Sequence, residues 1–468
     1  MSAQREYASR VPLGHACFAV DRQLTIAPPN GLLGQLQRGL GRGYRAAAKA
    51  GIGKDELLRC VLDDPRVDRQ LEERDAYYGG LAVLLGLDVE PLAAALRTGD
   101  LATGRGALAA DTLREMAVRG RNDARNALRD ALDGRGWPLA LCALEEADAL
   151  YGHRLLAVAD LHRVAAHPDS EIRDTVSWEG ALPWSRWAKH VPKLARLVAT
   201  LDVDVPSAPR TPVRKPDTAM STAELLRMVE PPNDVRIARI LAQRRDARSL
   251  SALEVAARHG SHDARLAALR ALGAQGYRGL LPYVVEQLES KAGDGPPFRS
   301  LPPLLRYLDS LPGDATLPLA RRWLASGGPR SIAAERVLAS HARAEDRALA
   351  EDALAGALDD ERHFRACDMA QALGRIGDPR STAGLVAAYE RSAYSWIRPR
   401  VLDALAACRS DALAALATEA LWDCDGSARE VGARLAPMTR DVRSRLEEMG
   451  EDALEEERVR TVADARSA

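Results

Sequence analysis

The sequence is poor in three kinds of residue: aromatics, cysteines and lysines. Aromatic side chains make up 4% of the chain, so helix-favouring alanine and leucine must supply most of the buried surface. The six cysteines include no Cys-x-x-Cys pair, which argues against zinc and thioredoxin-like motifs and is typical of a reduced, cytoplasmic protein. No apolar run reaches the roughly 18 residues of a membrane-spanning helix, and no secretory signal is expected at the N-terminus.

Positive and negative charges are almost balanced. The 65 basic and 66 acidic residues give a net charge of −1, so no general attraction to nucleic acid or to an anionic membrane is expected. Six of the basic residues are lysines, and the excess of arginine is typical of a GC-rich genome. The number of arginines is therefore no evidence for phosphate binding.

A helical repeat is the strongest pattern in the chain. Leucines near the ends of apolar-periodic stretches lie 36, 30, 35, 32 and 30 residues apart, at Leu272, Leu308, Leu338, Leu373, Leu405 and Leu435. Leu241 extends the series by one step upstream. Such a period accommodates two helices of about 10 to 14 residues and two short turns. The repeat predicts an all-α chain in which stacked antiparallel helix pairs form an α-solenoid.

The clearest repeat unit runs from Asp359 to Glu390. Phe364, Met369 and Leu373 give its first helix an apolar stripe, and Gly-Asp-Pro then separates that helix from the next. Its Ala-Leu-Gly-x-Ile-Gly-Asp-Pro-Arg run, residues 372–380, resembles a HEAT repeat of the phycobilisome-lyase-like subtype. The resemblance is carried mainly by this unit and its neighbours, and it implies a HEAT-like solenoid.

The resemblance constrains the fold more than the function. Proteins with this subtype include adaptors, bilin lyases, a hydroxylase and relatives of DNA glycosylases. The hydroxylase relatives use His-Glu pairs in their repeats as iron ligands. No His-Glu pair occurs in this chain, so that activity is not expected here.

Composition divides the chain into four parts. Residues 1–200 predict a less regular helical N-terminal domain that is partly repeat-like. Residues 201–220 include four prolines and predict a linker. Residues 221–440 hold the HEAT-like array, and residues 441–468 form a highly charged C-terminal tail.

Three local expectations accompany this division. A helix is predicted from about Gly31 to Ala50. Ser221 and Glu224 have the spacing of a capping box and would open the first helix of the array. The tail from Glu451 onward is expected to fray because it is so highly charged.

Two glycine runs and the histidines do not make a convincing site. The run from Gly39 to Gly43 lacks the third glycine of a dinucleotide motif. The run from Gly51 to Asp55 lacks the Ser or Thr that a Walker loop requires, so Gly51 is expected to end a helix instead. His259 and His262 have no third ligand nearby. The sequence therefore predicts no catalytic residue, metal site or cofactor.

A tryptophan-rich segment, residues 178–193, mixes indoles with cations. Such a mixture can stack nucleic-acid bases and bind phosphates, and related glycosylases place tryptophans beside a catalytic Asp. The alternative is that the indoles are packed in the interior, because large aromatics usually contribute by burial. The candidate contact residues are Trp178, Trp184, Trp187, Lys189 and His190.

Arginines also recur on the second helices of the repeats. In HEAT arrays these helices usually line the concave surface, where a row of arginines would suit an acidic partner. The alternative is pairing inside the array with the equally abundant carboxylates. The candidates are Arg265, Arg336, Arg365 and Arg398.

The sequence thus leaves more than one function open. The favoured hypothesis is a non-enzymatic scaffold or adaptor that binds a partner protein through the concave face of the solenoid. The alternative is a nucleic-acid-binding protein, such as a DNA base glycosylase, that uses residues 178–193. A third hypothesis, that the protein is a lyase-like chaperone for a tetrapyrrole, rests on the subtype resemblance alone.

Overall fold

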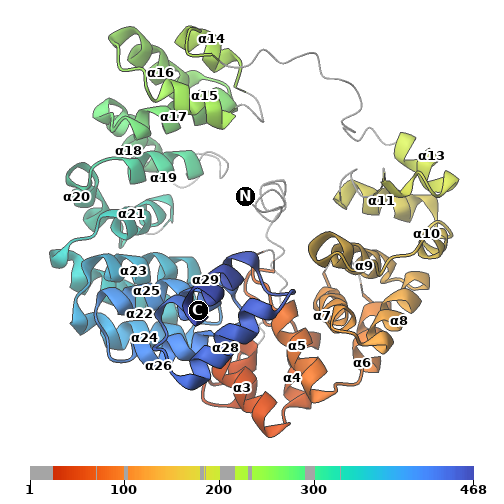
Figure 1. Cartoon of the computed structure of the whole chain (residues 1–468). Helices are drawn as coiled ribbons and strands as arrows, with labels where there is room; N and C mark the ends of the chain where they lie inside the picture. The colour runs from red at the N-terminus through yellow and green to blue at the C-terminus, as the bar shows by residue number, and fades with distance from the viewer. Residues whose placement is uncertain are drawn as a thin grey trace. The chain divides into compact units, whose positions relative to one another are not determined.

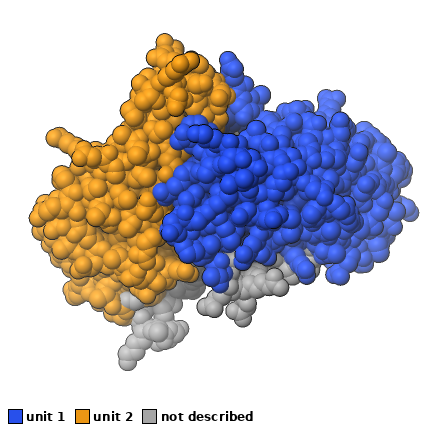
Figure 2. Space-filling model, turned by 90° about the horizontal axis from the view of Figure 1, so that it is seen from below, with its two compact units in different colours: residues 1–207, 422–426, 450–457 blue, residues 208–421, 427–449, 458–468 orange. Residues whose placement is uncertain are grey.

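The computed structural model describes residues 25–69, 71–99, 104–179, 184, 186–200, 217–229, 234–289, 301–326 and 328–468. Regular structure in these residues is helical throughout, without a β-strand, which confirms the predicted all-α class. None of the helices described has both the length and the apolar content needed to cross a bilayer. The chain forms two compact units, which Figure 2 colours separately. Unit 1 comprises residues 1–207, 422–426 and 450–457, and unit 2 comprises the remainder.

From residue 222 onward the chain is a series of helix pairs (Figure 1). The first helices of these pairs are α14 (Thr222–Arg227), α16 (Ala247–His259), α18 (Leu281–Glu289), α20 (Gly313–Trp323), α22 (Arg347–Asp359), α24 (Thr382–Arg391), α26 (Leu413–Ala420) and α28 (Arg440–Glu451). The second helices are α15 (Asp234–Leu241), α17 (His262–Ala274), α19 (Leu301–Ser310), α21 (Gly328–His341), α23 (His363–Ile376), α25 (Ile397–Ala407), α27 (Gly426–Leu435) and α29 (Glu457–Ser467).

Second helices pack on one another in chain order. The sequence of contacts is α15 on α17, α17 on α19, α19 on α21, α21 on α23 and α23 on α25. First helices α14 and α16 pack together, as do α22 and α24. The main contacts of each helix are therefore with its own pair and with the adjacent pairs.

The repeating leucines occupy equivalent places in this series. Each lies in a different second helix, from Leu241 in α15 to Leu435 in α27. The first six are at most 1% exposed, and Leu435 is half-buried. The period read from the sequence therefore marks the helix that contacts both neighbouring pairs.

Unit 1 repeats the same local plan. Its helices are α2 (Leu32–Arg38), α3 (Gly41–Ala50), α4 (Lys54–Leu62), α5 (Asp75–Leu85), α6 (Glu90–Arg97), α7 (Ala107–Val118), α8 (Asn122–Asp130), α9 (Trp137–Tyr151), α10 (Val158–Val164), α11 (Asp169–Glu179) and α13 (Pro192–Thr200). Second helices α3, α5, α7 and α9 pack in order, and first helices α2, α4, α6 and α8 do the same. The N-terminal part is thus closer to the repeat pattern than its sequence suggested.

Two short segments from far along the chain complete unit 1. Cys424 is 3% exposed within the same apolar core as the helices from α2 to α13, and Leu454 packs against that core. The domain boundaries expected from composition did not include this return of the chain. Residues 201–216 of the predicted linker lie outside the described residues.

Local signals had mixed outcomes. The capping box is confirmed, because the Ser221 hydroxyl accepts a hydrogen bond from the Glu224 main-chain N–H and the Glu224 carboxylate accepts one from the Ser221 N–H. The single helix expected from Gly31 to Ala50 is wrong: Gly39, at φ 69°, ends α2 in the left-handed conformation. The fraying expected beyond Glu451 is also wrong, because α29 forms there with Val459 and Ala463 fully buried.

Candidate binding surface

Two of the four arginines predicted to face a partner are paired inside the protein. Arg336 on α21 lies 3.1 Å from the Asp309 carboxylate on α19 and 3.3 Å from that of Asp368 on α23. Arg365 on α23 pairs with Glu335 on α21 at 3.4 Å. These ion pairs join consecutive second helices, so Arg336 and Arg365 take the alternative role, pairing within the array.

Two other arginines are also poorly placed for a partner. Arg398 is completely buried in α25, so it does not lie on a binding surface. Arg265 is half-buried, and its guanidinium donates to the Gly260 carbonyl oxygen at 3.4 Å. Arginine spacing along the sequence identified the right helices but not the face on which each side chain lies.

The tryptophan-rich segment contributes to the interior of unit 1. Trp184 is fully buried and Trp187 is 5% exposed, and their rings make an edge contact with centroids 5.1 Å apart. Trp184 also contacts the buried Trp137 of α9, at 6.4 Å between centroids. Neither Trp184 nor Trp187 offers a free face to a nucleic-acid base. Both indoles are therefore packed in the interior, which was the alternative to base stacking.

The remaining candidates of this segment are two exposed basic residues and one tryptophan whose side chain is not described. Lys189 and His190 are exposed in the turn before α13. The side chain of Trp178, at the end of α11, lies outside the described residues. Neighbouring cations are tied to carboxylates: Arg186 pairs with Glu145 at 2.5 Å and Lys193 with Asp169 at 3.0 Å.

A buried ionic network, which the sequence analysis did not identify, crosses three second helices of unit 1. Arg114 on α7 is 3% exposed and pairs with Asp75 on α5 and with Glu146 on α9. Burial raises the pKa of Asp111 to about 6 and that of Glu146 to about 7, against the opposing pull of the Arg114 charge. Because the two carboxylates share one guanidinium, this network links α5, α7 and α9. Among the described residues, no group of three or more His, Cys, Asp or Glu side chains could hold a metal ion.

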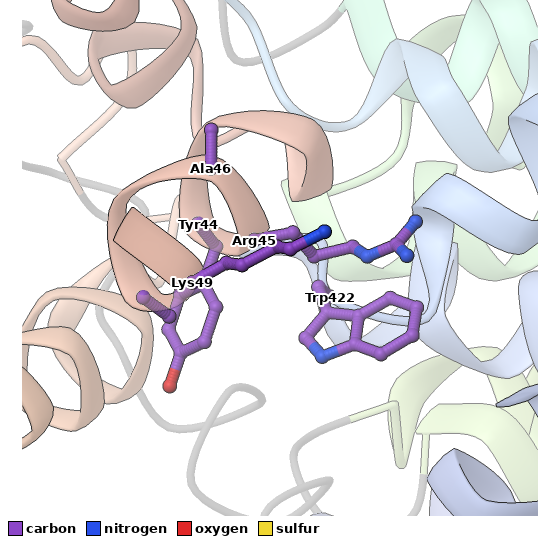
Figure 3. Close-up of a pocket in the computed structure, with 6 residues that line it drawn as sticks. Tyr44, Arg45, Ala46, Lys49 and Trp422 are labelled. Carbon is purple, nitrogen blue, oxygen red and sulfur yellow. The ribbon is translucent and has the colours of Figure 1, made fainter. Parts of the chain in front are cut away.

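A different surface, on α3, combines cations with aromatic rings. The guanidinium carbon of Arg45 lies 4.5 Å from the ring centroid of Trp422, within the range of a cation–π contact. Figure 3 shows the side chains of Arg45 and Lys49 extending from α3 towards the Trp422 indole. We call this site the α3–Trp422 pocket; its volume is about 530 Å³, and it is lined by Tyr44, Arg45, Ala46, Ala48, Lys49 and Trp422.

Charge distinguishes this pocket from the arginine pairs described above. Arg45 and Lys49 are exposed and lie one helical turn apart. Neither makes an ion pair with any residue that the structure describes. Two cations are therefore available beside a half-buried indole.

The fold fixes both sides of the pocket. Tyr44 packs against the buried Tyr77 of α5, with ring centroids 5.3 Å apart, which orients α3. A main-chain hydrogen bond holds the segment that carries Trp422 against the end of α2. In this bond the Cys424 N–H donates to the Gly39 carbonyl oxygen at 3.0 Å. An indole and two cations from distant parts of the sequence are thereby held together within unit 1.

Sequence reasoning considered this stretch but missed the pocket. It set aside a phosphate loop at Gly51 in favour of a helix C-cap, and the structure confirms the cap, with Gly51 at φ 65° ending α3. Lys49 could have been noticed as one of only six lysines. No local signal near Trp422 indicates that it meets α3, because that contact depends on the tertiary fold.

Comparison with known proteins adds no relative. No family model, no curated protein and no solved structure matches the chain. The likeness to HEAT repeats therefore rests on the residues of the repeats themselves.

Proposed function

We propose that this protein is a non-enzymatic scaffold or adaptor that binds a partner protein through its second helices. In this proposal the helix pairs form a HEAT-like α-solenoid, and the row of second helices lines its concave face. Stacked pairs of this kind present an extended surface suited to protein partners. The α3–Trp422 pocket of unit 1 is the proposed anchoring point for the partner.

The observation that carries this proposal is the contrast between paired and available arginines. Arg336 lies between the carboxylates of Asp309 and Asp368 on the two adjacent helices, whereas Arg45 contacts the Trp422 ring without an ion pair in the part of the chain described. Tryptophan, tyrosine and arginine are the residues most enriched at the energetic centres of protein interfaces. All three occur together in this pocket.

Nucleic-acid binding has less support. Two of its three candidate indoles, Trp184 and Trp187, are buried. The two cations at Trp422 are few for a ligand whose affinity depends on contacts with many phosphates. A protein partner needs only one or two complementary charges at an anchoring point.

The proposal is tested by comparing partners of matched variants. The full-length protein is tagged and cross-linked in its native cells, alongside Trp422→Ala and a control, Arg59→Ala. Arg59 is an exposed α4 cation outside the pocket, paired with Asp63 at 3.8 Å. We expect at least one protein to be captured by the wild type and the control but lost with Trp422→Ala.

The interaction is then rebuilt from purified proteins. Loss of an interface centre of this kind should weaken binding by about tenfold or more. If Trp422→Ala binds every purified partner as tightly as the wild type, the anchoring role is wrong. If the purified protein forms no stable complex with any captured protein, the scaffold function itself is wrong.

A further inference from the structure

We infer that the α3–Trp422 pocket recognises a carboxylate side chain in an acidic peptide segment of a partner, with an apolar residue beside that carboxylate. This inference rests on the proposed scaffold function and names the chemistry of its anchoring point. Three features support it: the orientation of Arg45, the second charge of Lys49 and the apolar lining.

The stacking of Arg45 prepares its guanidinium for a carboxylate. Its guanidinium carbon lies over the Trp422 ring, 4.5 Å from the ring centroid. No described residue forms an ion pair with this guanidinium, so its N–H donors remain available. Those donors match a carboxylate in a bidentate geometry, and restricting the side chain before binding lowers the entropy cost of recognition.

Lys49 supplies a second positive charge at the same place. It follows Arg45 by one helical turn, and in Figure 3 its side chain extends to the same side of α3. Elsewhere arginines form ion pairs with carboxylates, as Arg336 does with Asp309. A carboxylate that enters the pocket would complete here the type of contact that the array makes internally.

The rest of the lining is apolar. Ala46, Ala48 and the rings of Tyr44 and Trp422 complete the lining of this open depression, and its volume of about 530 Å³ can receive a side chain together with its neighbour. A bare phosphate or a polynucleotide backbone would leave this apolar surface unused. An acidic residue next to a leucine or an aromatic residue would use both parts.

The test begins with a displayed library of random dodecapeptides selected on the full-length protein. Peptides that also bind an Arg45→Ala/Lys49→Ala double variant are removed. We expect the remaining sequences to be enriched in Glu or Asp within two positions of a large apolar residue. Enrichment of sequences without carboxylates would overturn the inference.

The best peptide is then synthesised with a fluorescent label and titrated by anisotropy. Arg45→Ala should weaken its binding by about tenfold or more, because a charge-assisted contact is lost. Arg45→Lys should recover only part of the affinity, because lysine keeps the charge but not the planar donor set. Arg59→Ala should bind normally, and a peptide with Gln in place of Glu should bind weakly.

Competition distinguishes the possible sources of negative charge. A phosphoserine version of the peptide, inorganic phosphate and a short single-stranded DNA are added separately to the labelled complex. Displacement by DNA or phosphate at lower concentrations than the unlabelled Glu peptide would overturn the peptide inference. If purified partners still require Trp422 while no acidic peptide binds, the scaffold function stands and only this inference falls.

Discussion

Gly39 and Cys424 are joined by a main-chain hydrogen bond of 3.0 Å, although they stand near opposite ends of the sequence. Gly39 is in the left-handed conformation, and a Cβ placed on it would lie 2.2 Å from the Cys424 Sγ. The contact therefore requires glycine twice, for its backbone conformation and for the close approach of the sulfur. Through this contact the segment that carries Trp422 is fixed against α2 and α3.

Replacing Gly39 should destabilise the protein more than replacing other helix-ending glycines. We expect Gly39→Ala to lower the free energy of unfolding by roughly 2 to 4 kcal/mol, from backbone strain and steric overlap. Gly51 is the matched control, since it has φ 65° but no atom near its added Cβ, and Gly51→Ala should cost about 1 kcal/mol. Urea unfolding measures both, and equal losses would show that the approach of Cys424 is unimportant.

The Arg114 network should be essential for the stability of unit 1. Removing the guanidinium with Arg114→Met leaves the half-buried carboxylates of Asp75 and Glu146 without their counter-charge, which should lower the free energy of unfolding by about 2 to 4 kcal/mol. Arg59→Met removes an exposed pair instead and should cost less than about 0.5 kcal/mol. Guanidinium unfolding curves of the two variants test the contrast. A small effect of Arg114→Met would mean that water compensates the carboxylates.

Glu335 should make stability depend on pH near neutrality. Burial raises its pKa from the usual 4.5 to about 7, against the opposing pull of the Arg365 charge. The folded protein binds this proton more tightly than the unfolded chain does. The stabilisation of the fold that results is therefore complete below about pH 4.5 and is lost as the pH rises through about 7.

The neutral variant Glu335→Gln isolates this contribution. Between about pH 5 and pH 7 its stability should fall less steeply than that of the wild type, by at most about 1.4 kcal/mol per pH unit. Chemical unfolding at a series of pH values measures the difference. Parallel curves would indicate that Glu335 is ionised throughout this range and that its ion pair with Arg365 outweighs burial.

Replacing Trp184 with alanine should destabilise the protein more than replacing Trp422 with alanine. Trp184→Ala removes a fully buried indole packed on Trp137 and Trp187 and should cost about 3 to 5 kcal/mol. Trp422→Ala removes a half-buried ring together with its cation–π contact to Arg45, and should lower the free energy of unfolding by less, about 1 to 2 kcal/mol. Thermal and urea unfolding compare them. A marginal effect at position 184 would contradict its place in the core.

Features of the fold that depend on local sequence were predictable. The spacing of the leucines located the second helices, because a buried stripe must recur wherever a pair contacts its neighbours. The capping box at Ser221 was predictable for the same reason, since its partners are three residues apart. Gly39 was misjudged because a left-handed glycine and a glycine inside a helix look alike in sequence.

The candidate site was not predictable in the same way. Arg398 and Arg336 occur in similar sequence positions, yet one is completely buried and the other lies between two carboxylates. A side chain's burial depends on how adjacent helices are rotated, which a single sequence does not encode locally. The meeting of Trp422 with Arg45 depends in addition on the return of the chain to unit 1.

That return has a consequence for synthesis. Because residues 422–426 and 450–457 complete unit 1, the ribosome must translate through residue 457 before the first helices acquire these neighbours. A product that stops before residue 422 would keep Arg45 and Lys49 but lack the Trp422 indole that contacts the guanidinium. Recognition through this pocket would thus be reserved for chains translated beyond Trp422.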